Sequence, residues 1–130
     1  MNAKSLLLKT LGLLFASVTA ISIAPAASWP ERPIRIIIPW PPGGSTDITT
    51  RLVIQRLTEQ LGVTIVVDNR PGAGAVIVTE AAARAPADGY TLLAMAVEFT
   101  INPSLRKLPY DPLRDFTCIA QLTTGQYFLS

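Results

Sequence analysis

The sequence lacks several residue types on which common enzymatic chemistries depend. It has no histidine and one cysteine, Cys118, among 130 residues. Without histidine the chain cannot supply a Ser/His/Asp triad, and a zinc site is not expected either. A single cysteine excludes an internal disulfide, and because Cys118 lies in an apolar run we expect a buried, structural thiol. These absences argue against an enzyme and against a bound metal.

Charge of either sign is also sparse. The chain has 11 Lys plus Arg against 9 Asp plus Glu, and charged residues make up only 15% of it. It has no basic block, and its few aromatic residues are not interleaved with Arg or Lys. Nucleic acid is therefore not expected as a partner.

The first 26 residues have the pattern of a secretory signal peptide. Lys4 and Lys9 give a basic start without acids, residues 11–23 are mostly apolar, and Ala24 and Ala26 form an A-x-A cleavage site. A retained membrane anchor is the alternative, since residues 10–30 are uncharged and about 20 residues can span a bilayer. Pro25 and the neighbouring alanines weaken that alternative, so we expect export with cleavage near Ala26.

After residue 26, short apolar strands alternate with helices. We expect strands within residues 33–40, 64–69, 90–97 and 117–122, helices at 46–61 and 76–85, and a helical turn at 104–107. The run Ile36 to Ile38 does not alternate with polar residues, which is typical of a central strand covered on both faces. Such βαβ units predict an α/β fold with a mostly parallel sheet flanked by helices, and ligands bind beyond the carboxyl ends of its strands.

Two glycine-rich turns lie at that expected edge, "PWPPGGSTD" at residues 39–47 and "RPGAGA" at residues 70–75. Glycine lets bare backbone approach a ligand, and the helix that follows each turn offers unpaired N–H groups to an anion. We expect Ser45 or Thr46 to cap the first helix and Gly62 to end it. The candidate ligand-binding residues are Trp40, Gly43, Gly44, Ser45, Thr46 and Asp47 in the first turn, and Ala73, Gly74 and Ala75 in the second.

The anion is better explained as a carboxylate than as a phosphate cofactor. A Walker loop needs a lysine that the first turn lacks, and a dinucleotide fingerprint needs a third glycine where Ile77 stands. Backbone donors can hold a carboxylate without an arginine clamp. Asp47 is either a helix-start residue or an acceptor for a ligand donor, and Trp40 is either core or a wall of the site. Arg70 is expected to be solvated or paired with Asp68 rather than bound to the ligand.

Five motifs in register resemble the Bug family, the receptors of tripartite tricarboxylate transporters. They are "WPERPIRIIIPWPPGGSTD", "VVDNRPGAGA", "APADGYTLL", "INPSL" and "LPYDPLRDFT", which together span Trp29 to about Leu122. The resemblance implies a periplasmic-binding-protein fold of type II, a Venus flytrap whose two lobes enclose an organic anion. It implies a di- or tricarboxylate, an acidic amino acid or an aromatic acid as ligand, delivered to membrane permease subunits. It also implies no catalysis, no cofactor, a periplasmic location and, at full length, a monomer.

The sequence departs from this family pattern at two places near the expected cleft. The second turn continues through Ala75, Val76 and Ile77, which makes that wall more apolar than is usual in the family. "AMAVEFT" replaces a small, polar run after the third strand and brings in Glu98. A carboxylate there would repel an anionic ligand unless it were protonated or paired with a ligand cation, although Glu98 can equally point to solvent.

The chain is also less than half as long as the family's two-lobed receptors. We therefore expect residues 27–122 to form the N-terminal ligand-binding lobe and residues 123–130 to begin the crossover to a second lobe that this chain lacks. The leading hypothesis is a truncated half of a carboxylate receptor. A nonfunctional or partner-dependent fragment is the alternative, and an enzyme with a nucleotide cofactor is a third, weaker one.

Overall fold

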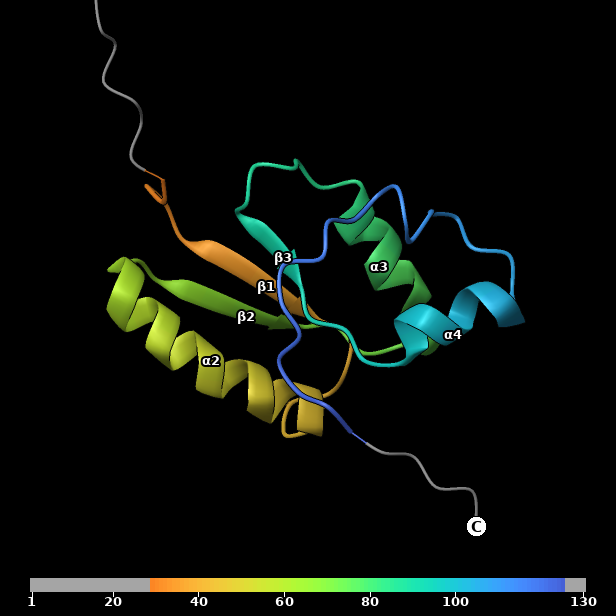
Figure 1. The fold of residues 1–130 in the computed structure, drawn as a ribbon, viewed down its shortest axis with the longest axis horizontal. Helices are drawn as coiled ribbons and strands as arrows, with labels where there is room; N and C mark the ends of the chain where they lie inside the picture. Colours follow the sequence, from red (N-terminus) through yellow and green to blue (C-terminus); the bar gives the residue numbers. More distant parts are fainter. Residues whose placement is uncertain (1–28, 126–130) are drawn as a thin grey trace, which may run out of the picture.

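The computed structural model describes residues 29–125, so the expected signal peptide and the last five residues lie outside the described part. The elements in chain order are β1 (Ile34–Ile38), α2 (Ser45–Leu61), β2 (Ile65–Asn69), the 3₁₀ turn η1 (Ala73–Ala75), α3 (Val76–Ala83), β3 (Thr91–Leu93) and α4 (Glu98–Leu105). Figure 1 shows their arrangement. The alternation of strands and helices that the sequence predicts is confirmed.

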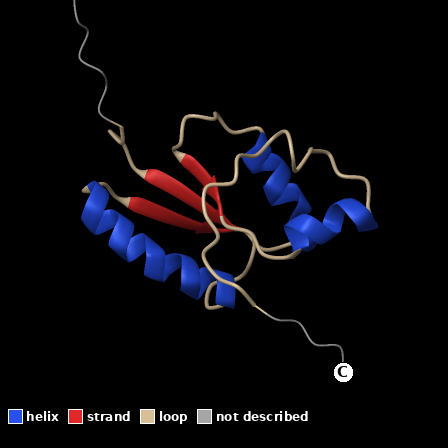
Figure 2. Ribbon diagram, viewed as in Figure 1, coloured by secondary structure: helices blue, strands red, loops and turns tan. Residues whose placement is uncertain are grey.

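The three strands form one parallel sheet in the order β2-β1-β3. Ile36 in the middle of β1 is paired with Val67 of β2 on one side and with Leu92 of β3 on the other. Each crossover contains a helix, and right-handed crossovers in opposite directions place α2 and α3 on opposite faces of the sheet. Figures 1 and 2 show the two helices on either side of the strands.

Burial is concentrated on β1, as expected for a central strand. Ile34, Ile36, Ile37 and Ile38 are all nearly inaccessible to solvent. The sequence gives β2 the same apolar appearance, but β2 is an edge strand and Val66 is 48% exposed. Position in the sheet, rather than composition, makes this difference.

An ion pair joins two neighbouring strands. Arg35, the one charged residue of β1, donates from Nε to Asp68 Oδ2 of β2 at 2.9 Å. Arg70 also donates to Asp68 at 2.9 Å, which confirms the expectation that Arg70 is paired with this carboxylate. The hydrogen bond from Arg35, with a smaller contribution from Arg70, lowers the pKa of Asp68 below its ordinary value.

The sequence prediction fails after β3. The expected strand at 90–97 is only three residues long, and α4 starts at Glu98 and continues through Pro103, where we expected a helical turn only at 104–107. A proline disfavours the helical conformation of the residue before it, so the pair Asn102-Pro103 indicates a loop in the sequence. Here Asn102 is buried and its side chain is bonded to a neighbouring loop, which outweighs that preference.

The predicted strand at 117–122 is wrong. This segment has no regular structure, Ile119 is 76% exposed, and Cys118 is exposed rather than buried. Unlike this segment, the connection just before it is packed on α4. Phe116 contacts Phe99 edge-to-face with ring centroids 5.3 Å apart, and Tyr110 is stacked on Phe99 and edge-to-face with Phe116.

Candidate functional site

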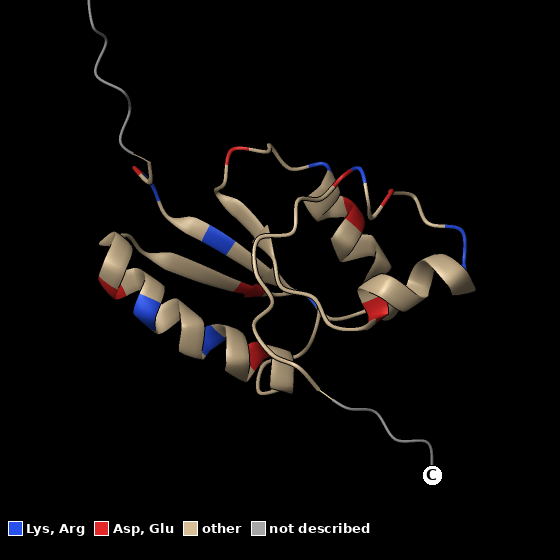
Figure 3. Cartoon of the chain, viewed as in Figure 1, with Lys and Arg blue, Asp and Glu red and all other residues tan. Residues whose placement is uncertain are grey.

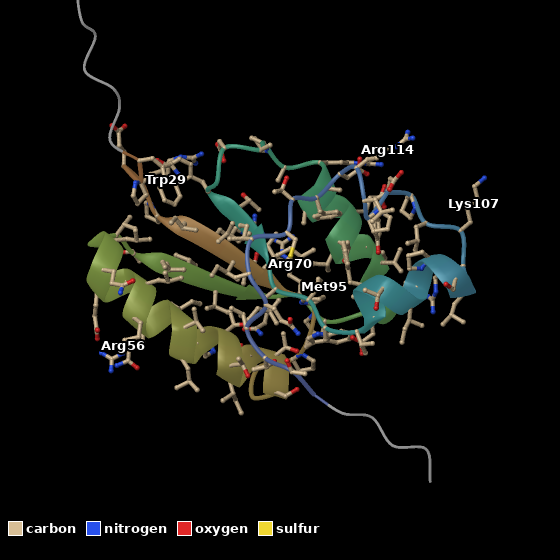
Figure 4. The ribbon with its side chains drawn as sticks, viewed as in Figure 1. Trp29, Arg56, Arg70, Met95, Lys107 and Arg114 are labelled. Carbon is tan, nitrogen blue, oxygen red and sulfur yellow. The ribbon has the colours of Figure 1, made fainter. Side chains whose placement is uncertain are left out.

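The carboxyl ends of the three parallel strands meet at one edge, and the candidate residues leave from it. The connections 39–44, 70–75 and 94–97 follow β1, β2 and β3 respectively. The strand order β2-β1-β3 places the topological switch point between β1 and β3, so the first glycine turn and the 94–97 connection flank the position where open α/β sheets bind their ligands. In Figure 4, Arg70 and Met95 lie near this edge, whereas Trp29 lies at the other end of the sheet.

The first glycine turn leads directly into the start of α2. Gly43 has φ +85°, a conformation that other residues rarely adopt, and Gly44 is the N-cap with extended backbone. The expected side-chain cap from Ser45 or Thr46 is wrong, since no side chain caps this helix. Ile48 is the first residue whose N–H finds a helical acceptor, the Gly44 carbonyl at 2.9 Å. The N–H groups of Ser45, Thr46 and Asp47 have no acceptor among the described residues and are therefore available to an anion.

Asp47 holds the first turn in place. Its carboxylate is 3% exposed and accepts hydrogen bonds from Gly43 N at 2.9 Å, Arg51 Nε at 2.9 Å and Asn69 Nδ2 at 2.9 Å. These bonds, with Arg51 the largest contributor, lower the pKa of Asp47 far below its ordinary value. The structure therefore supports Asp47 as a helix-start residue that fixes the turn, with its oxygens already occupied by protein donors.

Asn69 connects the first turn to the end of β2. Besides Asp47, its amide Nδ2 donates to the carbonyl of Trp40 at 3.1 Å, and its Oδ1 accepts from Arg51 Nη2 at 3.0 Å. The sequence analysis missed Asn69 and Arg51. The sequence did contain a signal for Asn69. It ends a strand and directly precedes the "RPG" turn, so it is expected at the same edge of the sheet as the neighbouring turn.

The second glycine turn is held in a rare backbone conformation. Gly72, Ala73, Gly74 and Ala75 all have positive φ, and for the two alanines this is strained. Asn102 Nδ2 of α4 donates to the Gly74 carbonyl at 3.1 Å. Thr79 Oγ1 of α3 donates to the Ala75 carbonyl at 2.7 Å. Strain of this kind persists only where surrounding groups fix it, and it gathers at binding sites.

The structure brings the candidate residues of both turns to one edge but gives them different exposures. Gly43, Gly44, Ser45, Ala73 and Gly74 are exposed, Trp40 and Thr46 are half-buried, and Asp47 and Ala75 are buried. The exposed backbone is thus offered to solvent from two neighbouring turns. Asp47 and Ala75 support that backbone from inside.

A hollow of about 410 Å³ elsewhere is lined by Trp29, Glu31, Arg32, Asp88 and Tyr90. Its one basic residue is already engaged, since Arg32 is paired with Asp88 at 2.7 Å and lies over the Tyr90 ring at 4.0 Å, and the remaining Glu31 would repel an anion. It therefore competes poorly with the glycine edge as a ligand site.

Metal-binding clusters and membrane-spanning helices are both absent from the described part of the chain. Residues 29–125 contain no cluster of three or more His, Cys, Asp or Glu side chains that could hold a metal ion. Within the same residues, no helix is long and apolar enough to cross a membrane. Figure 3 shows the charged residues of both signs scattered over helices, strands and loops.

The fold and the switch-point site define a class, the type II periplasmic binding proteins. Periplasmic binding protein BugD has this fold with a TM-score of 0.64 and 43% identity over 68% of this chain and 30% of its own. MatC of Rhodopseudomonas palustris, solved with bound malate, gives a TM-score of 0.63 and 31% identity over 72% of this chain and 33% of its own.

Within that class, the chain belongs to the tripartite tricarboxylate transporter receptor family, whose sequence pattern it matches over residues 49–129. Protein BugT of Bordetella pertussis is 40% identical over 122 residues, covering 89% of this chain and 36% of BugT. The Bug resemblance that the motifs indicate is thus confirmed. The chain spans about a third of the length of the relatives it matches.

Proposed function

We propose that this chain is the N-terminal lobe of a periplasmic receptor that binds a small organic carboxylate for uptake by a tripartite tricarboxylate transporter. The observation that carries the proposal is the pair of glycine turns at the carboxyl edge of β1 and β2. The first presents the free N–H groups of the α2 N-terminus, and the second presents strained, exposed backbone at Ala73 and Gly74. Both arrangements suit a carboxylate.

The solved relative MatC supports the ligand class, because it holds malate, a four-carbon dicarboxylate. In the relatives, about two-thirds of the length lies outside the part that matches this chain. We expect that part to supply the second wall of the clamp, since small-molecule sites bury most of the ligand surface. The division into a signal peptide at 1–26, a lobe at 27–122 and a crossover from 123 remains a prediction, as do the permease partner and the monomeric state.

The experiment is a ligand-binding panel on the purified protein. Aliphatic di- and tricarboxylates, amino acids and aromatic acids are each added at millimolar concentration, and the melting temperature is followed. A ligand present at 100 times its Kd stabilises the folded state by about 2.7 kcal/mol, which raises the melting temperature well above the noise of the assay. Neutral amides of the same acids serve as controls. If no acid gives a larger shift than its amide, the carboxylate assignment is wrong.

A further inference from the structure

Glu98 has a feature that no other acidic residue of the described chain shares. Like Glu31 and Asp115 it forms none of the ion pairs found in residues 29–125, but it alone has an enclosed carboxylate oxygen, Oε2, without a hydrogen-bond partner among those residues. Enclosing a polar atom without a partner costs free energy, so such an atom calls for an explanation. A carboxylate that simply faces water would not have an enclosed oxygen. Glu98 thus has an acceptor with no protein donor to match it.

Glu98 also lies at the edge where the two glycine turns meet. It is the first residue of α4, directly after the 94–97 connection from β3. One turn further along α4, Asn102 donates to the Gly74 carbonyl, so the start of α4 is held beside the second glycine turn. Met95 of the same connection lies 3.8 Å from Thr79 Oγ1 of α3.

A donor without an acceptor is found at the same edge. Trp40 Nε1, in the first glycine turn, is enclosed and has no hydrogen-bond partner in the described residues. The edge therefore offers donors, from the indole and from the N–H groups at the start of α2, and one unmatched carboxylate acceptor. A ligand that satisfies both kinds of group carries a carboxylate and a protonated nitrogen.

We propose that Glu98 selects the ligand of this site by accepting a hydrogen bond from a protonated amine, so that the preferred ligand is a zwitterionic organic acid rather than a plain dicarboxylate. The inference rests on the proposed function, which supplies the carboxylate-binding half of the site. An unpaired carboxylate rejects a second ligand carboxylate by like-charge repulsion and rewards an ammonium group in the same place. Glu98 therefore disfavours plain dicarboxylates and favours acids that also carry an ammonium group.

The test compares acids that differ only in the amine. Three matched pairs are titrated calorimetrically into the purified protein, namely aspartate and succinate, glutamate and glutarate, and 4-(aminomethyl)benzoate and 4-methylbenzoate. In the pair that binds, the amine-bearing acid is expected to bind about tenfold or more tightly, as for a charge-assisted hydrogen bond. Glu98→Gln, which has nearly the same shape, is expected to abolish this preference. Glu98→Asp keeps the negative charge, so the amine-bearing acid is expected to remain the tighter ligand of its pair.

Glu59→Gln is the matched control. Glu59 lies on the exposed face of α2, where it is paired with Arg56, and the substitution removes the same charge without changing the edge. The variant is expected to retain the full preference. If an amine-free acid binds as tightly as its partner, or if Glu98→Gln leaves the preference unchanged, the inference is wrong although carboxylate binding stands. If the protein binds no acid of the panel, the proposed function fails and this inference fails with it.

Discussion

The two adjacent glycines of the first turn, Gly43 and Gly44, are expected to respond differently to the same substitution. Gly43 has φ +85°, and a Cβ added there would meet no atom within 4 Å. The cost of Gly43→Ala is therefore conformational, about 1–2 kcal/mol for an L-residue in the left-handed region. Reduced freedom of the unfolded chain offsets up to about 1 kcal/mol of this cost. We expect a net loss of about 1 kcal/mol.

Gly44 has φ −72° and ψ 164°, which any residue adopts, and an added Cβ would lie 3.6 Å from the Pro41 carbonyl oxygen, an ordinary contact. Gly44→Ala gains stability through the unfolded chain and loses a comparable amount because alanine is a poorer N-cap than glycine. The free energy of unfolding should stay within about 0.5 kcal/mol of the unsubstituted protein.

Urea unfolding followed by circular dichroism measures the difference. Both variants should keep the slope of the unfolding free energy against urea, and only Gly43→Ala should shift the midpoint to lower urea. In thermal unfolding, 1 kcal/mol corresponds to about 4–8 °C for a domain of this size. Equal shifts for both variants, or a larger loss at Gly44, would refute the backbone conformation on which the site rests.

The Asn102 hydrogen bond, the lowered pKa values of Asp47 and Asp68, and the exposure of Cys118 each give a further prediction. Asn102→Ala removes the donor to the Gly74 carbonyl and is expected to lower the free energy of unfolding, measured in urea, by about 1–2 kcal/mol. Amide hydrogen exchange in the second glycine turn is expected to become faster. Unchanged exchange there would contradict the supporting role of Asn102. Because the folded pKa values of Asp47 and Asp68 lie below their ordinary value near 3.8, stability is complete above that pH and is lost as the pH falls below it. Asp47→Asn should lose stability at neutral pH and show a smaller further loss in acid, and an unchanged acid transition would exclude this cause. Cys118 is exposed, so a thiol reagent is expected to label it as fast in the folded protein as in 6 M urea, and strong protection would contradict the exposure.

The sequence predicted the elements that depend on local pattern. The apolar run of β1 and the αL glycine that ends α2 are both found, with Gly62 at φ +65° donating to the Thr58 carbonyl at 3.0 Å. These features follow from burial and from backbone sterics, which act over a few residues. The edge of the sheet at which the candidate site lies could also be predicted from the alternation of strands and helices, because parallel strands bring their carboxyl ends together.

The sequence did not predict the contacts between distant segments. The bond from Asn102 to Gly74 joins residues 28 positions apart, and the bond from Asn69 to Asp47 joins residues 22 positions apart. A proline after Asn102 indicated a loop, and only the tertiary bond explains the helix there. The apolar residues of 117–122 indicated a strand, but the described residues provide no neighbouring strand with which this segment pairs.

The ion pair between Arg35 and Asp68 has a consequence for how the sheet assembles. Asp68 is paired in register with Ile37, so Arg35 lies two residues away on β1 and on the same face of the sheet. Side chains alternate between faces along a strand, so a slip of β2 by one residue would turn Asp68 to the opposite face, away from Arg35. Before Asp68 and Asn69, β2 is a run of three similar apolar residues that faces the isoleucines of β1, and apolar contacts alone discriminate weakly between such alignments. The single charged residue of β1 therefore favours the observed alignment of β2 over a one-residue slip, and the ion pair helps to hold the two glycine turns in their relative positions.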